Sequence, residues 1–314
     1  MKASYLTKRM LSAVVIMLAV ATIVFFAMRV IPSDPAQVVL GTYATEEALQ
    51  AFRREMGLDQ PLWRQYLDFI GNLVQGDLGR SMITNRPIAE QIWALFPYTF
   101  NLAISSTIIG ALIGIPLGVW AAIRKNTAVD YVSRIVALAG FSFPAFYLGV
   151  VLLLIFSVEL GWFPVIHQVR TGTLSEHLHK LVLPALSLGL IQASYVTRLT
   201  RSSMLEALNE DYVRTAFAKG LRPRTVHFKH VLKNIMIPVV TAIGLYTGTI
   251  LGGAILTETV FNRPGLGKLL VGAISQRDYN LIQSGLLVFA FIVVIVNLLV
   301  DLTYSLFDPR VKYE

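Results

Sequence analysis

The stretch that decides how this chain is organised is Asn209-Glu-Asp-Tyr-Val-Arg-Thr-Ala-Phe-Ala-Lys-Gly220, which lies between two apolar segments. Its first residue is a suitable helix N-cap, acidic residues follow in the first turn, and a lysine precedes the helix-ending Gly220. Val213, Ala216 and Phe217 have i, i+3, i+4 spacing, which predicts a short helix with one apolar stripe. A helix of about 15 Å is too small to be a domain. We interpret it as a segment presented to another protein.

The composition is that of a membrane protein. Of the 314 residues, 55% are hydrophobic and 15% are charged, and the mean hydropathy is +0.62. A soluble protein carries about a quarter charged residues, and here the apolar residues gather in long runs. The sequence therefore predicts an all-α polytopic membrane protein. The chain has no cysteine, which excludes disulfides, thiolate metal sites and a cysteine nucleophile.

Six apolar stretches reach or approach the ~20 residues that cross a bilayer core. Their predicted limits are 10–30, 98–123, 135–157, 181–197, 235–256 and 285–307. The fourth is the weakest, because it is short and contains several polar residues. The first has too long an apolar run for a signal peptide and lacks a cleavage site, so we interpret it as an uncleaved anchor. Together they predict a single membrane domain over 1–314.

The distribution of charge predicts the orientation. With a cytoplasmic N-terminus, 16 of the 27 Lys and Arg residues fall in the inner segments, which are 1–9, 124–134, 198–234 and 308–314. The positive-inside rule therefore places both termini in the cytoplasm. The net charge of +8 reflects this topology rather than a surface that binds nucleic acid.

The outer segment 31–97 is the only long loop of the predicted topology. Thr45–Met56 and Pro61–Val74 are predicted amphipathic helices that lie on the membrane surface or on the helical bundle. The sequence leaves open whether they form a packed cap or a docking surface.

Glycines repeat every four residues in the second and fifth spans, at Gly110, Gly114 and Gly118 and at Gly244, Gly248 and Gly252. Such faces let helix backbones approach closely, so we predict that these two spans are inner, close-packed helices. Proline predicts a kink or a flexible point within a span, with Pro144 in Phe-Ser-Phe-Pro as the main example.

Polar residues within the spans are candidates for a translocation path, namely Asn101, Ser105, Gln192 and Ser194. They are equally explained as contacts between helices. Asp301 is the only acid well inside a predicted span, where it is either a proton relay or a partner of a basic residue. An ion-coupled secondary carrier or channel for a small polar solute therefore remains an alternative.

No segment of the sequence matches a known motif for catalysis, nucleotide binding or metal binding. Arg263–Lys268 superficially resembles a phosphate-binding loop, but it lacks the first glycine and the Ser or Thr after the lysine. The histidine pairs His177 and His179, and His227 and His230, lack a third ligand nearby, so we predict no metal site. We therefore expect no enzyme and no cofactor in this chain.

Several segments of the chain resemble those of a known family. Glu210–Gly220, followed by His230–Thr241, resembles the cytoplasmic "EAA" loop of binding-protein-dependent ATP-binding-cassette importers, in the form typical of the dipeptide/oligopeptide/nickel branch. Arg214-Thr-Ala stands where the general motif has Glu-Ala-Ala, which fits that branch. Further segments agree, namely Ile31–Pro35, Gly57–Pro61, Gly76–Gly79, Leu199–Ser203, Gly253–Glu258, Pro264–Gly267 and Asn297–Asp301. The resemblance covers the whole chain and is closest to the first permease subunits for dipeptides or glutathione.

The resemblance implies a type I importer permease fold with a coupling helix in the cytoplasmic loop 198–234. It implies that a second homologous permease completes the translocation path, that two partner ATPases bind ATP and Mg²⁺, and that an extracytoplasmic binding protein delivers substrate. The location implied is the bacterial cytoplasmic (inner) membrane, in contact with lipid and not with nucleic acid. Peptides are the first expectation for substrate, with dipeptides, oligopeptides, glutathione and metal chelates all open.

The resemblance also implies which residues couple to an ATPase, namely Glu210, Asp211, Tyr212, Val213, Arg214, Thr215, Ala216, Phe217, Ala218, Lys219 and Gly220. Val213, Ala216 and Phe217 are the expected apolar anchors, whereas Arg214 and Lys219 are expected to pair with acids of the ATPase. From the residues alone, a helix that rests on the inner leaflet fits equally well.

Overall fold

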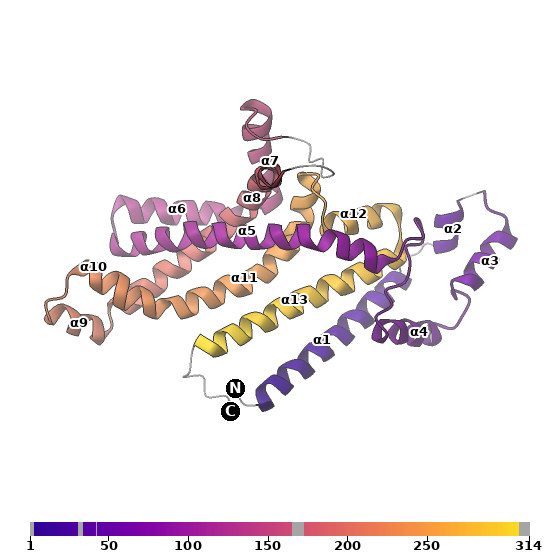
Figure 1. Cartoon of the computed structure of the whole chain (residues 1–314), viewed down its shortest axis with the longest axis horizontal. Coiled ribbons are helices and arrows are strands. Elements are labelled where there is room, and N and C mark those ends of the chain that lie inside the picture. The colour runs from indigo at the N-terminus through magenta and orange to yellow at the C-terminus, as the bar shows by residue number, and fades with distance from the viewer. Residues whose placement is uncertain (1–2, 31–33, 42, 165–172, 308–314) are drawn as a thin grey trace. The chain divides into compact units, whose positions relative to one another are not determined.

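A computed structural model describes residues 3–30, 34–41, 43–164 and 173–307. These residues form helices joined by short loops (Figure 1). The elements are α1 (Ala3–Val30), α2 (Pro35–Leu40), α3 (Glu46–Glu55), α4 (Leu62–Val74), α5 (Ile88–Ile123), α6 (Ala128–Ser142), α7 (Ala145–Leu153), a π-helical turn (Leu154–Glu159), α8 (Leu174–Leu208), α9 (Asp211–Ala218), α10 (Pro223–Thr225), a second π-helical turn (Val226–Val231), α11 (Leu232–Val260), α12 (Leu266–Gln276) and α13 (Tyr279–Phe307).

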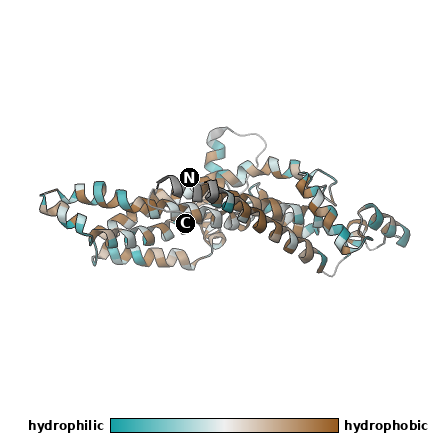
Figure 2. Cartoon of the chain, turned by 90° about the horizontal axis from the view of Figure 1, so that it is seen from below, coloured by the Kyte–Doolittle hydropathy of each residue, from teal (hydrophilic) through white to brown (hydrophobic). Residues whose placement is uncertain are grey.

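The described helices confirm the predicted all-α polytopic fold. Five are long and apolar enough to cross a membrane, at Thr7–Val30, Ile88–Ile123, Ser175–Leu208, Pro223–Val260 and Tyr279–Val300. A sixth candidate is the pair Ala128–Ser142 and Ala145–Glu159, whose axes differ by 101°. Apolar residues run along the long helices (Figure 2).

The predicted third span, 135–157, is broken sharply at Pro144. Phe143 ends α6 in an extended conformation, with φ −97° and ψ 133°, and Pro144 precedes α7. A proline ring disfavours helical dihedrals in the residue before it, which explains why the break falls here. The prediction of a bend at Pro144 is therefore confirmed, whereas Pro184 lies inside the continuous helix α8.

The described helices group into two compact units, 1–97 with 265–294 and 98–264 with 295–314. In the first unit, a core is formed by Ile88, Ile92, Leu266, Ala273, Leu281 and Ile282. Asp278 caps α13 by accepting a hydrogen bond from the Leu281 N–H at 3.2 Å. The same carboxylate accepts hydrogen bonds from the Ser81 hydroxyl and the Met82 N–H, which attaches the end of the outer loop to α13.

Both predicted amphipathic helices of the outer loop are confirmed as α3 and α4. Thr45 caps α3, and its hydroxyl accepts a hydrogen bond from the Ala48 N–H at 3.3 Å. Tyr66 and Phe69 of α4 contact Phe25 of α1, with ring centroids 5.2 and 5.6 Å apart. The helix α4 is therefore packed against the first span.

In the second unit, α8 lies at the centre and contacts α6, α7 and α11, and its side chains also meet the glycines of α5. Three glycines of α5 permit this packing. A Cβ added at Gly114 would lie 2.7 Å from the Val196 Cβ, and one at Gly118 would lie 2.6 Å from the Thr200 Cβ. A Cβ added at Gly110 would likewise overlap the Gln192 side chain. The second span thus packs closely on the fourth, because no side chain separates their backbones.

The glycines of the fifth span differ from one another. Gly244 of α11 lies against Val300, and Gly248 is buried. Gly252 is exposed, and no described side chain lies within 4 Å of a Cβ placed there. None of the described residues covers α11 at Gly252, so close packing at that position stays a prediction.

The fourth span was predicted as 181–197 and the weakest, whereas α8 has 35 residues and is the most enclosed of the candidate spans. Its polar side chains meet protein rather than lipid. The Thr197 hydroxyl donates to the Gly114 carbonyl at 3.3 Å, and the Gln192 amide donates to the Ile243 carbonyl at 3.4 Å. A helix surrounded by other helices needs little hydropathy, so hydropathy underestimates its length.

We predict opposite effects for two glycine-to-alanine changes. Gly114→Ala places a methyl group against the Val196 Cβ and the Ala193 carbonyl, which cannot rotate away. Such overpacking costs about 1–3 kcal/mol. Gly252→Ala meets no described atom and removes the entropic disadvantage of glycine in a helix. In thermal unfolding of the purified chain, the midpoint should fall for Gly114→Ala and stay or rise for Gly252→Ala. Equal midpoints would contradict this packing.

Candidate coupling surface

The helix α9 begins one residue later than the sequence predicts. Asn209 was expected to cap it, but Asn209 has helical dihedrals, with φ −89° and ψ −5°, and ends α8. Its amide donates to the Leu205 carbonyl at 3.0 Å. Glu210 takes the extended N-cap position instead. The correction has a physical cause: α8 continues to Leu208, and a residue in its last turn cannot also adopt the extended backbone of an N-cap.

Gly220 ends α9 as predicted. Its φ of +75° lies in the left-handed region, and its N–H donates to the Phe217 carbonyl at 2.9 Å. The Leu221 N–H donates to the Ala216 carbonyl at 3.3 Å. These two bonds form a Schellman motif, in which a residue other than glycine is strained. The helix therefore has a fixed end, and the chain turns back at once toward α10.

The apolar stripe of α9 points into its own chain. Val213 is 1% exposed and Ala216 is 9% exposed. Both belong to a core cluster with Met204 of α8, Val226 and Ile235. The expectation that Val213 and Ala216 contact a partner is wrong for these two side chains, because residues of this chain already cover them. They instead fasten α9 to α8 and α11.

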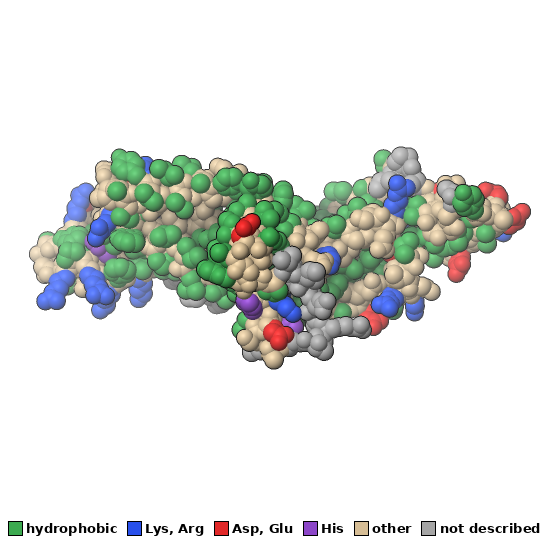
Figure 3. All heavy atoms as spheres, turned by 90° about the horizontal axis from the view of Figure 1, so that it is seen from above, with side chains coloured by type: hydrophobic (Ala, Val, Ile, Leu, Met, Phe, Trp, Pro, Cys, Tyr) green, Lys and Arg blue, Asp and Glu red, His purple; other side chains and the backbone are tan. Residues whose placement is uncertain are grey.

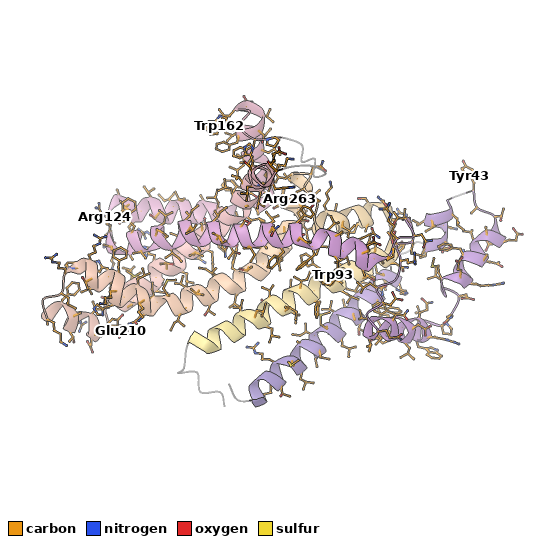
Figure 4. The ribbon with its side chains drawn as sticks, in the orientation of Figure 1. Tyr43, Trp93, Arg124, Trp162, Glu210 and Arg263 are labelled. Atoms are coloured by element: carbon orange, nitrogen blue, oxygen red, sulfur yellow. The ribbon has the colours of Figure 1, made fainter. Side chains whose placement is uncertain are left out.

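The side chains at the edges of this stripe, and the charged ones beyond them, are open. Tyr212 is 38% exposed and Phe217 is 41% exposed. Arg214 and Asp211 form an exposed pair, with 3.3 Å between Nη1 and Oδ1. Figure 3 shows Lys and Arg side chains gathered at the end of the second unit that holds α9, and Figure 4 labels Glu210 there. These exposed side chains, with an aromatic ring at each edge of the buried stripe and charges beyond them, are the candidate coupling surface.

A buried ion pair joins α6 to α8 in the same unit. Asp130 of α6 is fully buried, and both of its oxygens accept from Arg201 of α8, at 2.6 and 2.8 Å. The Asn126 N–H also donates to Asp130, at 3.0 Å, and Arg134 lies 3.7 Å away. Sequence reasoning missed this pair because the partners are 71 residues apart. The only local signal is an acid in the first turn of α6.

The four candidate path residues do not line one cavity. Asn101 is exposed and Ser105 is half-buried. Gln192 is buried against Gly110, and the Ser194 hydroxyl donates to Leu190 within its own helix. Assigning Gln192 and Ser194 to a path is therefore wrong for this structure. They are helix contacts, which is the other interpretation that the sequence allowed.

A cavity of about 530 Å³ does lie beside α11 in the second unit. Its lining includes Thr107 of α5 and Lys233, Thr241 and Thr247 of α11. The hydroxyls of Thr107 and Thr247 lie 3.1 Å apart. Most of the wall is aliphatic, so this cavity offers few hydrogen bonds to a polar solute.

A further carboxylate is buried at the end of α11. Glu258 is fully buried and accepts from the Thr99 hydroxyl at 2.6 Å. Arg263 follows it, is 7% exposed, and burial lowers its pKa. The sequence places Glu258 outside the fifth span, whose predicted end is 256, whereas the candidate span continues to Val260 and Glu258 lies two residues before that end. The side chain of Asp301 lies outside the described residues, as does His167.

The comparisons with known proteins decide the family. The family described as "Binding-protein-dependent transport system inner membrane component" matches residues 114–313. Its N-terminal companion, "Binding-prot-dependent transport system membrane comp, N-term", matches residues 2–103. The chain belongs to this family.

Full-length relatives agree. The dipeptide transport system permease protein DppB of Alkalihalophilus pseudofirmus is 41% identical, with 99% of each chain covered. The di/tripeptide transport system permease protein DppB of Pseudomonas aeruginosa is 39% identical, again with 99% of each chain covered. The glutathione transport system permease protein GsiC of Escherichia coli K12 is 41% identical over the same share.

Two solved structures share the fold. The methionine transporter MetNI in an inward-facing conformation gives a TM-score of 0.55 at 17% identity, over 67% of this chain and 93% of that chain. An amino acid ATP-binding-cassette transporter with histidines gives 0.50 at 15% identity, over 71% and 95%. The predicted importer permease fold is therefore confirmed.

Family membership settles the class of protein. The chain is a multi-pass inner-membrane permease subunit of a binding-protein-dependent transport system, and not an enzyme. The ion-coupled carrier that the sequence left open is disfavoured, because the relatives are permease subunits of transport systems.

Removing one partner of the buried ion pair should destabilise the protein. Asp130→Asn leaves Arg201 without its carboxylate, and the loss should be about 3 kcal/mol, the low end for a broken buried pair, because Arg201 is still 19% exposed. Asp211→Asn is the matched control, since it breaks an Asp–Arg pair in which both side chains are exposed. Chemical unfolding of the two variants should separate them clearly. A loss for Asp211→Asn as large as for Asp130→Asn would contradict this assignment.

Proposed function

We propose that this chain is a permease subunit of an ATP-driven importer for peptides and forms the translocation path with a second homologous permease. The names of three full-length relatives support the substrate class, since two refer to dipeptides or tripeptides and one to glutathione. Glutathione is itself a small peptide with free carboxylates and an amine. The shared chemistry is a short zwitterionic peptide.

We infer that α9 is the coupling helix and that its exposed aromatic side chains dock in a groove of a partner ATPase. The single observation that carries this is the contrast in burial along the helix: Val213 and Ala216 are buried in the core, while Tyr212 and Phe217, on either side of them, are exposed. A helix that presents aromatic side chains beside charges suits helix-in-groove recognition, and aromatic side chains are frequent energetic anchors of interfaces.

The attachment of α9 would let a push on this face move the spans. The core cluster joins α9 to α8 and α11, and the pair of Asp130 with Arg201 joins α8 to α6. Closely packed helices move as rigid bodies rather than deforming. Closure of the ATPases would therefore be transmitted through α9 to α8, α11 and α6 at once.

The remaining parts of the system follow from this role. Two ATPase subunits would bind ATP and Mg²⁺, and an extracytoplasmic binding protein would deliver the peptide. Both termini and α9 would lie in the cytoplasm, which the concentration of Lys and Arg in the inner segments supports. An inner-leaflet resting place for α9 is the competing interpretation.

The proposal predicts that Phe217→Ala uncouples transport. Loss of an anchor side chain should cost at least about 2 kcal/mol of docking energy, or roughly thirtyfold in affinity. ATP-dependent peptide uptake in cells should fall at least tenfold, and the ATPases should no longer co-purify with the permease pair.

Tyr131→Ala is the control, because Tyr131 is an exposed aromatic residue of α6, 52% exposed and remote in sequence from α9. Its uptake should match the wild type. Unchanged uptake and co-purification in Phe217→Ala, with normal membrane levels, would show that α9 does not dock in this way.

A further inference from the structure

A cation in the first unit has only neutral partners. Arg29 lies in the last turn of α1, with its guanidinium 3.9 Å from the centre of the Phe25 ring. Its Nη1 donates to Gln283 at 2.9 Å and its Nη2 donates to Gln65 at 3.3 Å. Among the described residues, no carboxylate pairs with it. A guanidinium has five N–H donors, so this one keeps unused capacity for an anion.

Two cavities adjoin this guanidinium. One has a volume of about 260 Å³ and the other about 200 Å³. Both are lined by Arg29, Gln65, Asn280 and Gln283, so these four side chains stand between them. Three of the four are amides, which can both donate to and accept from a peptide group.

The other charges in the larger cavity cancel. Arg53 donates to Asp34 through Nε at 3.1 Å and also through Nη2. The hydrogen bond from Arg53 lowers the pKa of Asp34, so this carboxylate stays ionised and balances Arg53. Arg29 is therefore the uncompensated charge of this cavity.

The smaller cavity carries the opposite sign. Asp68 of α4 and Asp77 line it together with Arg29. Asp77 accepts from the Gly79 N–H at 2.8 Å, which uses part of its acceptor capacity. The two adjoining spaces thus offer a cation, amides and carboxylates in one unit.

We propose that these cavities bind a short zwitterionic peptide, with its C-terminal carboxylate on Arg29 and its ammonium group toward Asp68 and Asp77. This rests on the proposed function for the substrate class and adds a binding site on this chain. An anionic lipid phosphate would also satisfy Arg29 and accept from the amides, but it brings no cation to Asp68 and Asp77. With the predicted topology, the site lies on the outer side, where a peptide arrives.

The test is equilibrium binding of trialanine to the intact transporter in phosphatidylcholine nanodiscs, without ATP or binding protein. The wild type should bind free trialanine about tenfold more tightly than its C-terminal amide, because the charge-assisted bonds are lost with the amide. Arg29→Gln should bind both with the affinity of the amide. Arg54→Gln, which removes an exposed charge of α3 outside both cavities, should keep the wild-type preference.

Equal binding of acid and amide by the wild type, or a preference retained by Arg29→Gln, would overturn the proposal. If Arg29→Gln does not fold, Asp68→Asn decides instead. The wild type should prefer the free amine over N-acetyl-trialanine, and Asp68→Asn should lose this preference while keeping that for the free acid. A wild type indifferent to acetylation would also overturn the site.

The same binding assay in nanodiscs that contain phosphatidylglycerol tests whether Arg29 binds a peptide carboxylate or a lipid phosphate. The preference for free trialanine over its amide should persist there. Loss of this preference would mean that a lipid phosphate occupies Arg29. The readout needs no ATP, so it is distinct from the test of the proposed function. If ATP-driven peptide uptake is intact but the transporter binds free trialanine and its amide equally, only the binding-site proposal is wrong. If there is no ATP-driven peptide uptake, the proposed function is wrong.

Discussion

The close approach of α5 to α8 is the constraint on which the second unit depends. It exists because Gly110, Gly114 and Gly118 place bare backbone against Gln192, Val196 and Thr200. In a membrane, helices gain little from hydrophobic burial against each other, so packing at this distance and hydrogen bonds such as Thr197 to the Gly114 carbonyl stabilise the pair. The helices α6, α7 and α11 pack against the centrally placed α8.

Because α9 is packed against α8 and α11, a force on α9 would be transmitted to them. Two residues separate the end of α8 at Leu208 from the start of α9 at Asp211, and Val213 and Ala216 pack into the core beside Met204. Asp130 and Arg201 tie the same end of α8 to α6. The exposed aromatic side chains of α9 are thus carried on a rigid support, as the proposed coupling role requires. In that role the chain would supply the coupling helix and part of the path, and ATPase subunits would supply the energy.

Much of this was predictable from sequence, and the failures share physical causes. Spans that face lipid were found by hydropathy, whereas α8 was underestimated because its Ser, Thr and Gln side chains face protein. The stripe of Val213 and Ala216 was recognised, but burial within a chain and burial against a partner produce the same pattern. Only the exposure of Phe217, at the edge of the same stripe, shows which side chains are left for a partner. The pair of Asp130 and Arg201 could not be predicted, since no local spacing connects residues so far apart, and the juxtaposition of Arg29 with Gln65 and Gln283 is likewise a product of the fold.

The most direct test of the coupling role is site-specific cross-linking, for which the absence of native cysteine is an advantage. A benzophenone attached to Phe217→Cys in the assembled, membrane-embedded transporter should form an adduct with an ATPase subunit, and the yield should change when ATP is bound. The same label at Tyr131→Cys should react with lipid or another permease helix. Adducts of the Phe217→Cys label with lipid alone would contradict the account, since α9 would then rest on the membrane and not in a partner.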